Sequence, residues 1–419
     1  MRNKQSNALF TQTDTETTLG RREQLTFKGN RSRGRHGWLR LTPAYSLHLV
    51  QHLVAGLSEH DVVLDPFCGT GTTALACAQQ NIACDTVDVN PFLVWLTSVK
   101  CALYSEAEIR HAQTFAQRIA SRKLDGSGAW TPPIQGIHKW WSEATLRALS
   151  GLFAQISDES SARSRDLLRI AFCRTAIETA AVSFGHQSMS FRSADSQPTL
   201  FSEPASDRVL VHFARAVADV VKSATETPAG TVKAVLGDSR DLALTLPADR
   251  YTAVITSPPY PNRMSYIREL RPYMYWLGYL SDGRQAGELD WKAIGGTWGC
   301  ATSFVAKWEP NPRIEIPWRG FQACVEAIKE HSDLLGRYVH KYFEDAMLHV
   351  DSLVRVLASG ARVHYVVGNS KFYDVLLPTE EIYASLFSAV GMSDISIERI
   401  RKRTSKKELF EFVVHANRK

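Results

Sequence analysis

Cysteine pairs, metal-ligand clusters and long apolar runs are all missing from this sequence. The seven cysteines contain no Cys-x-x-Cys pair and the 13 histidines form no His-Glu-x-x-His or zinc-finger spacing, so we expect neither a structural metal nor a disulfide framework. No run approaches the roughly 18 uncharged apolar residues of a membrane span, and no signal-peptide-like stretch is seen. We therefore expect a cytoplasmic protein without a membrane partner.

Over most of the chain, neither positive nor negative charge is in excess. The net charge is +6, and residues 1–40 alone carry nine Lys or Arg against three acids, so the rest of the chain sums to zero. We predict that residues 1–35 form a flexible basic arm. Such an arm can contact the phosphates of a nucleic acid, and the alternative is a solvated tail.

Apolar strand patterns alternate with helical patterns along the 419 residues. This alternation predicts an α/β fold with an open, mainly parallel sheet, closed by an antiparallel pair from the last two strands. A helical pattern over residues 321–357 suggests a helix of about ten turns with a break near Ser332. The seven expected strands cover residues 61–65, 82–89, 231–237, 251–257, 361–368, 393–400 and 408–416.

Two segments interrupt the alternation. Residues 123–230 begin with a Gly-, Ser- and Pro-rich stretch and continue as largely helical sequence, which predicts a helical insertion between two halves of one sheet, residues 36–122 and 231–419. Within the second half, residues 281–318 read as a long loop insertion that contains four of the ten tryptophans.

The sharpest local signal is DPFCGTGTT, which runs from Asp65 to Thr73 directly between a strand and a helix. Glycines at 69 and 71 allow a tight turn, and the start of a helix presents free N–H groups to an anion. Asp88 ends the next strand, where an acid can accept hydrogen bonds from both ribose hydroxyls. Because Asp65 precedes the glycines and no Gly-Lys-Ser/Thr follows, the turn suits a ligand with a cationic amine, such as the methionine part of S-adenosyl-L-methionine.

A second signal, Thr256-Ser257-Pro258-Pro259-Tyr260, follows another apolar strand. The prolines remove two N–H donors, so the Ser257 hydroxyl and the Pro258 carbonyl can accept hydrogen bonds from an exocyclic amine. Tyr260 supplies a flat face on which an extruded base can stack. The alternative is that the two prolines simply end the strand.

With these motifs the chain resembles the S-adenosylmethionine-dependent DNA amino-methyltransferases, which methylate cytosine N4 or adenine N6. DPFCGTGT looks like their cofactor motif, VDVNPF their ribose-binding segment, VLGDSRDL their third-strand motif and TSPPY their catalytic motif. HGWLRLTPAYSLHLV, residues 36–50, looks like the segment that closes over the cofactor. The resemblance implies a seven-stranded, Rossmann-like methyltransferase sheet.

The resemblance also implies roles for individual residues. Asp65 would face the amino group of the cofactor and Asp88 its ribose, while Asp238 with Asn90, Pro91 and Phe92 would hold the adenine. The remaining cofactor residues would be Pro66, Phe67, Gly69, Thr70, Gly71 and Thr72, and the target base would be held by Ser257, Pro258, Pro259 and Tyr260.

The substrate follows from the same motifs. Ser at the start of SPPY favours cytosine N4 over adenine N6, and carbon-5 methylation is excluded because no proline precedes a cysteine that could act as nucleophile. An RNA base methyltransferase and a catalytically silent DNA-binding subunit remain alternatives. The expected partners are double-stranded DNA and a restriction endonuclease. Candidate DNA contacts are the helical insertion and Arg192, Asn262, Arg263, Arg401, Lys402 and Arg403.

Overall fold

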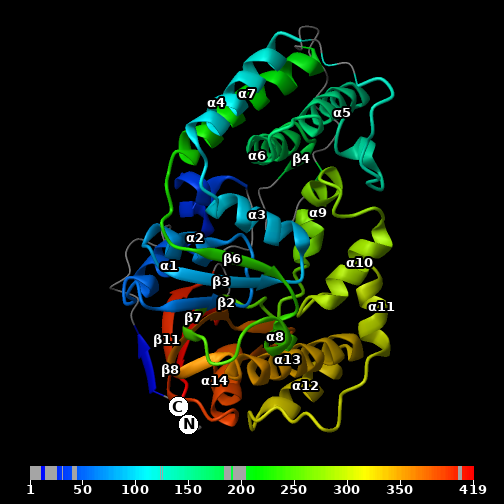
Figure 1. The fold of residues 1–419 in the computed structure, drawn as a ribbon. Coiled ribbons are helices and arrows are strands. Elements are labelled where there is room, and N and C mark those ends of the chain that lie inside the picture. Colours follow the sequence, from blue (N-terminus) through cyan, green and yellow to red (C-terminus); the bar gives the residue numbers. More distant parts are fainter. Residues whose placement is uncertain are drawn as a thin grey trace.

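The computed structural model describes residues 11–14, 26–30, 32–39, 45–122, 124, 126–183, 190–191, 204–403 and 408–419. Within them, one sheet runs through the middle of the fold, and helices cover both of its faces (Figure 1). No helix of the described residues combines the length and the apolar character needed to cross a bilayer.

The main sheet has eight strands, and the five at one end of it, from β8 to the edge strand β6, are parallel to one another. β12 is antiparallel to both of its neighbours, so β11 and β12 form the expected closing pair. All seven strands predicted from the sequence are present. In sheet order the strands are β1 (Thr11–Asp14), β11 (Ser393–Lys402), β12 (Phe410–Asn417), β8 (Leu357–Gly368), β7 (Tyr251–Thr256), β2 (Val62–Asp65), β3 (Ala83–Asp88) and β6 (Val232–Leu236).

Helices pack on both faces because successive strand residues point to opposite sides. Leu64 and Val254 face α13 (Asp333–Val354) and α14 (Thr379–Ala389), whereas Val63 and Ile255 face α1 (Leu47–Val54) and α2 (Thr72–Gln79). The predicted helix break is confirmed, since Ser332 caps the start of α13 after α12 has ended. The elements around the sheet are α1 (Leu47–Val54), α2 (Thr72–Gln79), α3 (Pro91–Cys101), η4 (Ser239–Asp241), α8 (Leu242–Thr245), α12 (Phe321–Lys329), α13 (Asp333–Val354), the β9 (Ser370–Phe372) and β10 (Val375–Leu377) pair, and α14 (Thr379–Ala389).

The helical insertion forms its own apolar core, onto which α3 and α9 (Tyr266–Trp276) also pack (Figure 1). It begins earlier than residue 123, because Ile109 and Phe115 of α4 lie in the same core as Phe213 of α7. Its elements are α4 (Glu106–Ala120), η3 (Ile137–Lys139), α5 (Glu143–Ser157), α6 (Ala162–Glu178), the β4 (Val182–Ser183) and β5 (Ser190–Phe191) pair, and α7 (Ala205–Ala224).

The prediction of a long loop over residues 281–318 is wrong, because the segment contains α10 (Gly283–Lys292) and α11 (Cys300–Lys307). Asp282 caps α10 by accepting a hydrogen bond from the N–H of Gln285. The buried Asp290 accepts further bonds from the Ser265 hydroxyl at 2.5 Å and the Trp298 N–H at 2.7 Å. These tertiary bonds order a segment whose composition is typical of a loop.

The prediction of a flexible arm over residues 1–35 is also wrong for most of the arm residues that the structure describes, because these form regular elements. β1 pairs in parallel with β11 as an eighth strand, and η1 (Phe27–Asn30) and η2 (Gly34–Gly37) follow. Arg35 is fully buried and donates to the carbonyls of Lys100, Ala102, Ser223, Ala224 and Glu226. Five backbone acceptors satisfy this guanidinium, which fastens η2 to the ends of α3 and α7.

Candidate active site

The cofactor turn, residues 65–72, joins β2 to α2. Gly69 and Gly71 adopt left-handed backbone angles, with φ of 50° and 72°. A Cβ atom at Gly71 would lie only 2.5 Å from Thr97 Oγ1, so the turn can pack against α3 only with glycine there. Cys68 N–H donates to the Val87 carbonyl at 2.9 Å, which ties the turn to β3.

Asp88 lies at the end of β3, directly beside the cofactor turn. Its two carboxylate oxygens accept hydrogen bonds from Gly69 N–H at 3.1 Å and Asn90 N–H at 2.9 Å. Burial raises the pKa of Asp88 to about 6, although these two hydrogen bonds favour the charged form. The acid predicted to bind ribose is therefore next to the glycines predicted to hold the methionine end.

Asp65 is almost completely buried, and one of its carboxylate oxygens has a well-defined environment. Oδ1 accepts from the Thr256 hydroxyl at 2.5 Å and from Phe67 N–H at 3.2 Å. Oδ2 has no hydrogen-bond partner among the described residues. Burial raises the pKa of Asp65 to about 7, against the effect of its hydrogen bonds. A buried carboxylate with an unpaired oxygen fits a ligand that brings a cationic amine.

The end of β6 completes this edge of the sheet. Gly237 N–H donates to the Asp88 carbonyl at 3.0 Å, which places Asp238 near Asp88. The Asp238 carboxylate is held by Arg240, whose guanidinium also reaches Asp345. Although burial acts in the opposite direction, the hydrogen bonds and charge of Arg240 lower the pKa of Asp238. Its charge is thus already neutralised by a protein cation.

Asn90, Pro91 and Phe92 form the start of α3. Asn90 caps the helix by accepting from Phe92 N–H at 3.0 Å, and Pro91 occupies the first helical turn. Phe92 is fully buried and stacks on Tyr273 of α9, with ring centroids 5.7 Å apart. The Phe92 side chain therefore belongs to the core between α3 and α9, whereas Asn90 N–H stays at the site through its bond to Asp88.

The catalytic turn, residues 257–260, follows β7. Tyr342 of α13 donates its hydroxyl to the Pro259 carbonyl at 2.6 Å. Tyr260 donates its own hydroxyl to Glu411 Oε1 at 2.9 Å. Burial, reinforced by the charge of Glu411, raises the pKa of Tyr260, so the phenol stays protonated. Ser257, at the start of this turn, carries a hydroxyl whose lone pairs can accept hydrogen bonds.

The residues proposed for DNA contact lie in different settings. Arg192 lies outside the described residues. Arg263 is exposed with a φ of 60°, and its N–H donates to Tyr338 on α13. Asn262 accepts from Met264 N–H in the same loop. Arg401 and Lys402 end β11, and Arg403 directly follows it. Arg401 bonds Glu411 at 2.6 Å, and Arg403 lies over the Tyr260 ring.

Several residues that sequence reasoning did not single out support this site. His349 is buried between the Ser239 carbonyl and the Tyr365 hydroxyl, and its ring lies 4.7 Å from that of Phe67. Burial lowers its pKa to about 4, so it is neutral. Lys100 is also buried and donates to the Thr70 carbonyl at 2.9 Å. A cation with carbonyl partners carries no sequence signal that separates it from a surface lysine.

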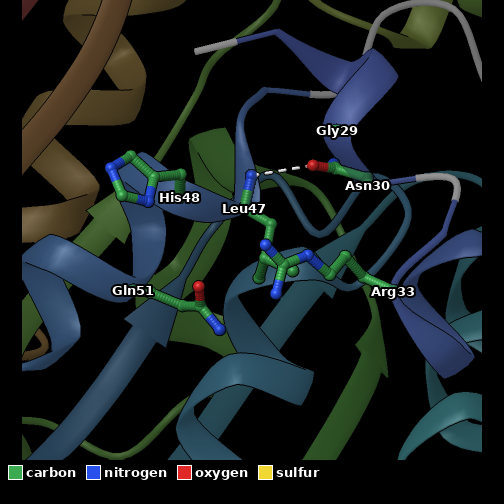
Figure 2. Close-up of a pocket in the computed structure, with 6 residues that line it drawn as sticks. All are labelled: Gly29, Asn30, Arg33, Leu47, His48 and Gln51. Carbon is green, nitrogen blue, oxygen red and sulfur yellow. Dashed lines mark hydrogen bonds between the residues drawn. The ribbon is translucent and has the colours of Figure 1, made fainter. Parts of the chain in front are cut away.

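A small pocket lies beside the segment predicted to close over the cofactor (Figure 2). Figure 2 shows Asn30 accepting from Leu47 N–H at the start of α1. None of the residues lining this pocket belongs to the cofactor or catalytic turns. They are Gly29, Asn30, Arg33, Leu47, His48 and Gln51.

Comparisons with known proteins agree with the motifs. Residues 42–94, which include the cofactor turn and Asp88, match the DNA methylase family of N6 and N4 methyltransferases. The chain is 22% identical to the Type II methyltransferase M.BsoBI of Geobacillus stearothermophilus, over 93% of this chain and 84% of that protein. It is 21% identical to M.AvaI of a Nostoc species, with 89% and 82% covered.

Among solved structures, the chain is similar to the rRNA methyltransferase aviRa of Streptomyces viridochromogenes. The TM-score is 0.27 at 12% identity, with 90% of this chain and 86% of that chain covered. The strand order and the strand directions of the main sheet define the fold.

Proposed function

We propose that the chain is a DNA methyltransferase, as the family match over residues 42–94 and the curated relatives support, and that it methylates cytosine N4 at a specific DNA sequence. The methyl donor in this proposal is S-adenosyl-L-methionine. When bound, it supplies an electrophilic methyl group on a sulfonium. The site-specific character is supported by the curated relatives, which are both named Type II methyltransferases.

One observation carries the proposal. Thr256, the residue before Ser257, donates its hydroxyl to the Asp65 carboxylate at 2.5 Å. This buried hydrogen bond joins the end of β7 to the end of β2, and so holds the catalytic turn against the cofactor turn. A methyl transfer needs its donor and acceptor in contact, and the two turns meet at this bond.

The residues of both turns suit the cofactor chemistry. Gly69 and Gly71 let the backbone approach a ligand, Asp65 Oδ2 offers an unpaired acceptor to an amine, and Asp88 offers acceptors to ribose hydroxyls. Because Arg240 already engages Asp238, we infer that Asp238 orders η4 beside the adenine and adds little charge to the site.

The catalytic turn supplies acceptors for the amine. The cytosine amine is conjugated with its ring and is a poor nucleophile, so its lone pair must be drawn out of conjugation. In the proposed complex the Ser257 hydroxyl and the Pro258 carbonyl accept hydrogen bonds from the amine. The Pro259 carbonyl does not take part, because Tyr342 occupies it. With the methyl group supplied by the bound cofactor, the amine would lose one proton, which would pass along its hydrogen bond to the Ser257 hydroxyl and on to water.

The target base must leave the duplex to reach this site, and Tyr260 is the surface on which we expect it to stack. Ser257 at the first position of SPPY supports cytosine over adenine. Recognition of the sequence is proposed to fall to the helical insertion. The Arg271 guanidinium of α9 lies 5.2 Å from the ring centroid of Trp140, which belongs to the insertion, and 5.5 Å from that of Trp298, which belongs to the 281–318 segment. The two segments therefore meet at α9, just after the catalytic turn. We expect a restriction endonuclease with the same target.

Methylation-sensitive sequencing of DNA from cells that express the chain tests this proposal, since it reports the base, the position and the sequence context. We expect N4-methylcytosine at one recurring sequence. N6-methyladenine would overturn the cytosine assignment alone. Unmodified DNA together with methylated RNA would overturn the proposed substrate.

The roles within the catalytic turn are tested by single-turnover methyl transfer. Ser257→Ala should slow transfer, while its affinities for cofactor and DNA stay near wild type, because only an acceptor for the reacting amine is lost. Ser388→Ala, an exposed serine on α14, is the matched control and should transfer at the wild-type rate. A wild-type rate for Ser257→Ala would remove this residue from the chemistry.

A further inference from the structure

The ring of Tyr260 is held by three residues that lie far from it in the sequence. Glu411 of β12, which is 5% exposed, accepts the Tyr260 hydroxyl at 2.9 Å and Arg401 Nε at 2.6 Å. The Arg403 guanidinium lies over the ring, 5.0 Å from its centroid. A Cβ atom at Gly368 would lie 2.8 Å from Tyr260 Cε2 and 2.6 Å from Arg403 Nη1, so the ring, the guanidinium and the end of β8 are closely packed.

Each member of this group is itself fixed. Arg403 donates from side-chain Nη1 to the Asn369 carbonyl at 2.8 Å. Its backbone N–H donates to the Leu409 carbonyl, which closes the end of the β11–β12 pair. Glu411 sits in a ladder of backbone bonds opposite Gly368. The side chains around Tyr260 are therefore anchored to the sheet.

The sheet order shows from which side Tyr260 is held. β7, which leads into Tyr260, lies between β2 and β8. The cofactor turn follows β2, whereas Gly368 of β8, Glu411 of β12 and Arg403, which directly follows β11, lie on the other side of β7. The ring is thus supported from the side that faces away from the cofactor turn.

We propose that Glu411 and Arg403 are positioning residues, which hold the Tyr260 ring as a preset stacking surface for the extruded base. This inference rests on the proposed function, in which Tyr260 stacks on that base. Glu411 fixes the hydroxyl end of the ring, Arg403 backs the ring itself, and Arg401 holds Glu411 in place through its hydrogen bond. Presetting the ring means that base extrusion does not also have to order a mobile tyrosine.

This arrangement assigns Arg401 and Arg403 a different role from the phosphate contacts that a basic run suggests. A guanidinium that contacts phosphate would contribute to DNA affinity at any sequence and would weaken with salt. A guanidinium that backs Tyr260 would instead affect how long the base stays extruded and how fast it is methylated. The two roles are separable by measuring DNA affinity and transfer rate in the same variants.

The experiment uses the full chain and a duplex oligonucleotide with 2-aminopurine at the target position, once that position has been mapped. Base extrusion is followed by fluorescence on this duplex, and methyl transfer by single-turnover kinetics on the same duplex with cytosine at the target position. We expect Glu411→Ala to lower both by about 10-fold or more, the loss typical of a hydrogen bond to a charged group. Glu411→Gln keeps an acceptor for the tyrosine and should recover most of the loss. Arg403→Ala should cost about two- to five-fold.

A double-variant comparison identifies the route of the effect. Tyr260→Phe keeps the stacking face but removes the hydroxyl, so it should resemble Glu411→Ala. Adding Glu411→Ala to Tyr260→Phe should then cause little further loss. Lys371→Ala, which removes an exposed ion pair with Glu408 at the same end of the sheet, is the control and should behave as wild type.

Glu411→Ala leaves Arg401 without its partner, so folding is checked by thermal unfolding and cofactor affinity. If that variant does not fold, Arg401→Met with Glu411→Met removes both charges, and the proposal predicts the same loss of base extrusion. A folded variant lacking Glu411 that extrudes and methylates at the wild-type rate would overturn the inference, as would losses that multiply in the double variant. A wild-type chain that methylates no DNA would overturn the proposed function instead.

Discussion

The cofactor turn and the catalytic turn sit on neighbouring strands, but they are stabilised in different ways. Gly69 and Asp88 are hydrogen-bonded across 19 residues of sequence, and Phe67 bonds Asp65 two residues away. Pro259 and Tyr260 are instead held by partners 83 and 151 residues away. The first turn is mainly a local structure, whereas the second depends on how α13 and β12 pack against β7.

This difference explains why a short motif can specify cofactor binding more completely than catalysis. Most of the contacts that shape the cofactor turn come from β2 to α3, and the turn and Asp88 lie within residues 42–94, which match the DNA methylase family. The Thr256 bond to Asp65 adds a distant contact. The geometry of the catalytic turn requires the last strand of the sheet. Substitutions that strain the local backbone should therefore affect the cofactor turn. Substitutions of residues distant in the sequence should affect the catalytic turn.

The largest effect is expected for Gly71→Ala. Its left-handed backbone costs a non-glycine residue about 1 to 2 kcal/mol, and the contact of the new methyl group with Thr97 adds about 1 to 3 kcal/mol. Gly128→Ala is the matched control, because it has a φ of 75° but open space around its Cβ position. Urea unfolding and calorimetry should show a larger stability loss, together with lost cofactor binding, only for Gly71→Ala. Equal losses in both variants would mean that close packing on Thr97 is unimportant.

Asp88→Ala should have the next largest effect. It removes acceptors for two ribose hydroxyls, each worth about 1.5 to 3 kcal/mol when the acceptor is charged, and should leave DNA affinity nearly unchanged. Asp238→Ala should weaken cofactor binding less, because Arg240 already occupies that carboxylate. Calorimetric titration with S-adenosylmethionine measures both. Unaltered affinity in Asp88→Ala would remove Asp88 from the cofactor site.

The sequence was sufficient to predict the sheet and the positions of both turns, because these features are local. Strands such as Val62–Asp65 are short apolar runs, and the glycines at 69 and 71 mark a turn that only they can form. The roles of Tyr342 and Glu411 could not be predicted. Glu411 reads as an ordinary polar residue in an apolar strand, and only the pairing of β12 with β8 places it at Tyr260.

Two predictions from the sequence, the flexible basic arm and the long loop over residues 281–318, are wrong for a similar physical reason. Arg35 adds to the basic charge of the N-terminal segment, but in the fold it is buried and donates to five backbone carbonyls. Composition carries no information about acceptors from distant segments. α10 begins with Gly283 and contains Gly287, both of which weaken an isolated helix. Gly287 is favourable in the folded protein because a Cβ atom there would lie 2.5 Å from Cys300 Sγ of α11. In both cases tertiary contacts override the local pattern.

The distant support of the catalytic turn is tested by Tyr342→Phe, for which a smaller effect is expected. The change removes one hydroxyl donor from the Pro259 carbonyl, a net loss of about 1 kcal/mol in stability. Methyl transfer should slow while cofactor affinity is retained, because the cofactor turn keeps all of its bonds. Tyr373→Phe, at an exposed tyrosine between β9 and β10, should change neither quantity. Loss of cofactor affinity in Tyr342→Phe would contradict the separation of the two turns.

The smallest effect expected is a pH dependence of cofactor binding that originates at Asp65. Burial raises its pKa from 3.8 to about 7, so the folded protein without ligand holds this proton more tightly than the unfolded chain does. Its contribution to stability is therefore present at acid pH and is lost as the pH rises through about 7.

Cofactor binding should respond in the opposite direction, because a cationic amine prefers the ionised carboxylate. With a pKa of about 7, the ionised fraction of Asp65 rises about three-fold between pH 6.5 and 7.5, and affinity for S-adenosylmethionine should follow it. Above about pH 8 the affinity should fall again, since an α-amino group loses its proton near there. Asp65→Asn should abolish the rise and keep the fall, which calorimetry across this pH range can measure. An unchanged rise in Asp65→Asn would assign the titration to another group, and Asp88, with a pKa of about 6, would be the next to substitute.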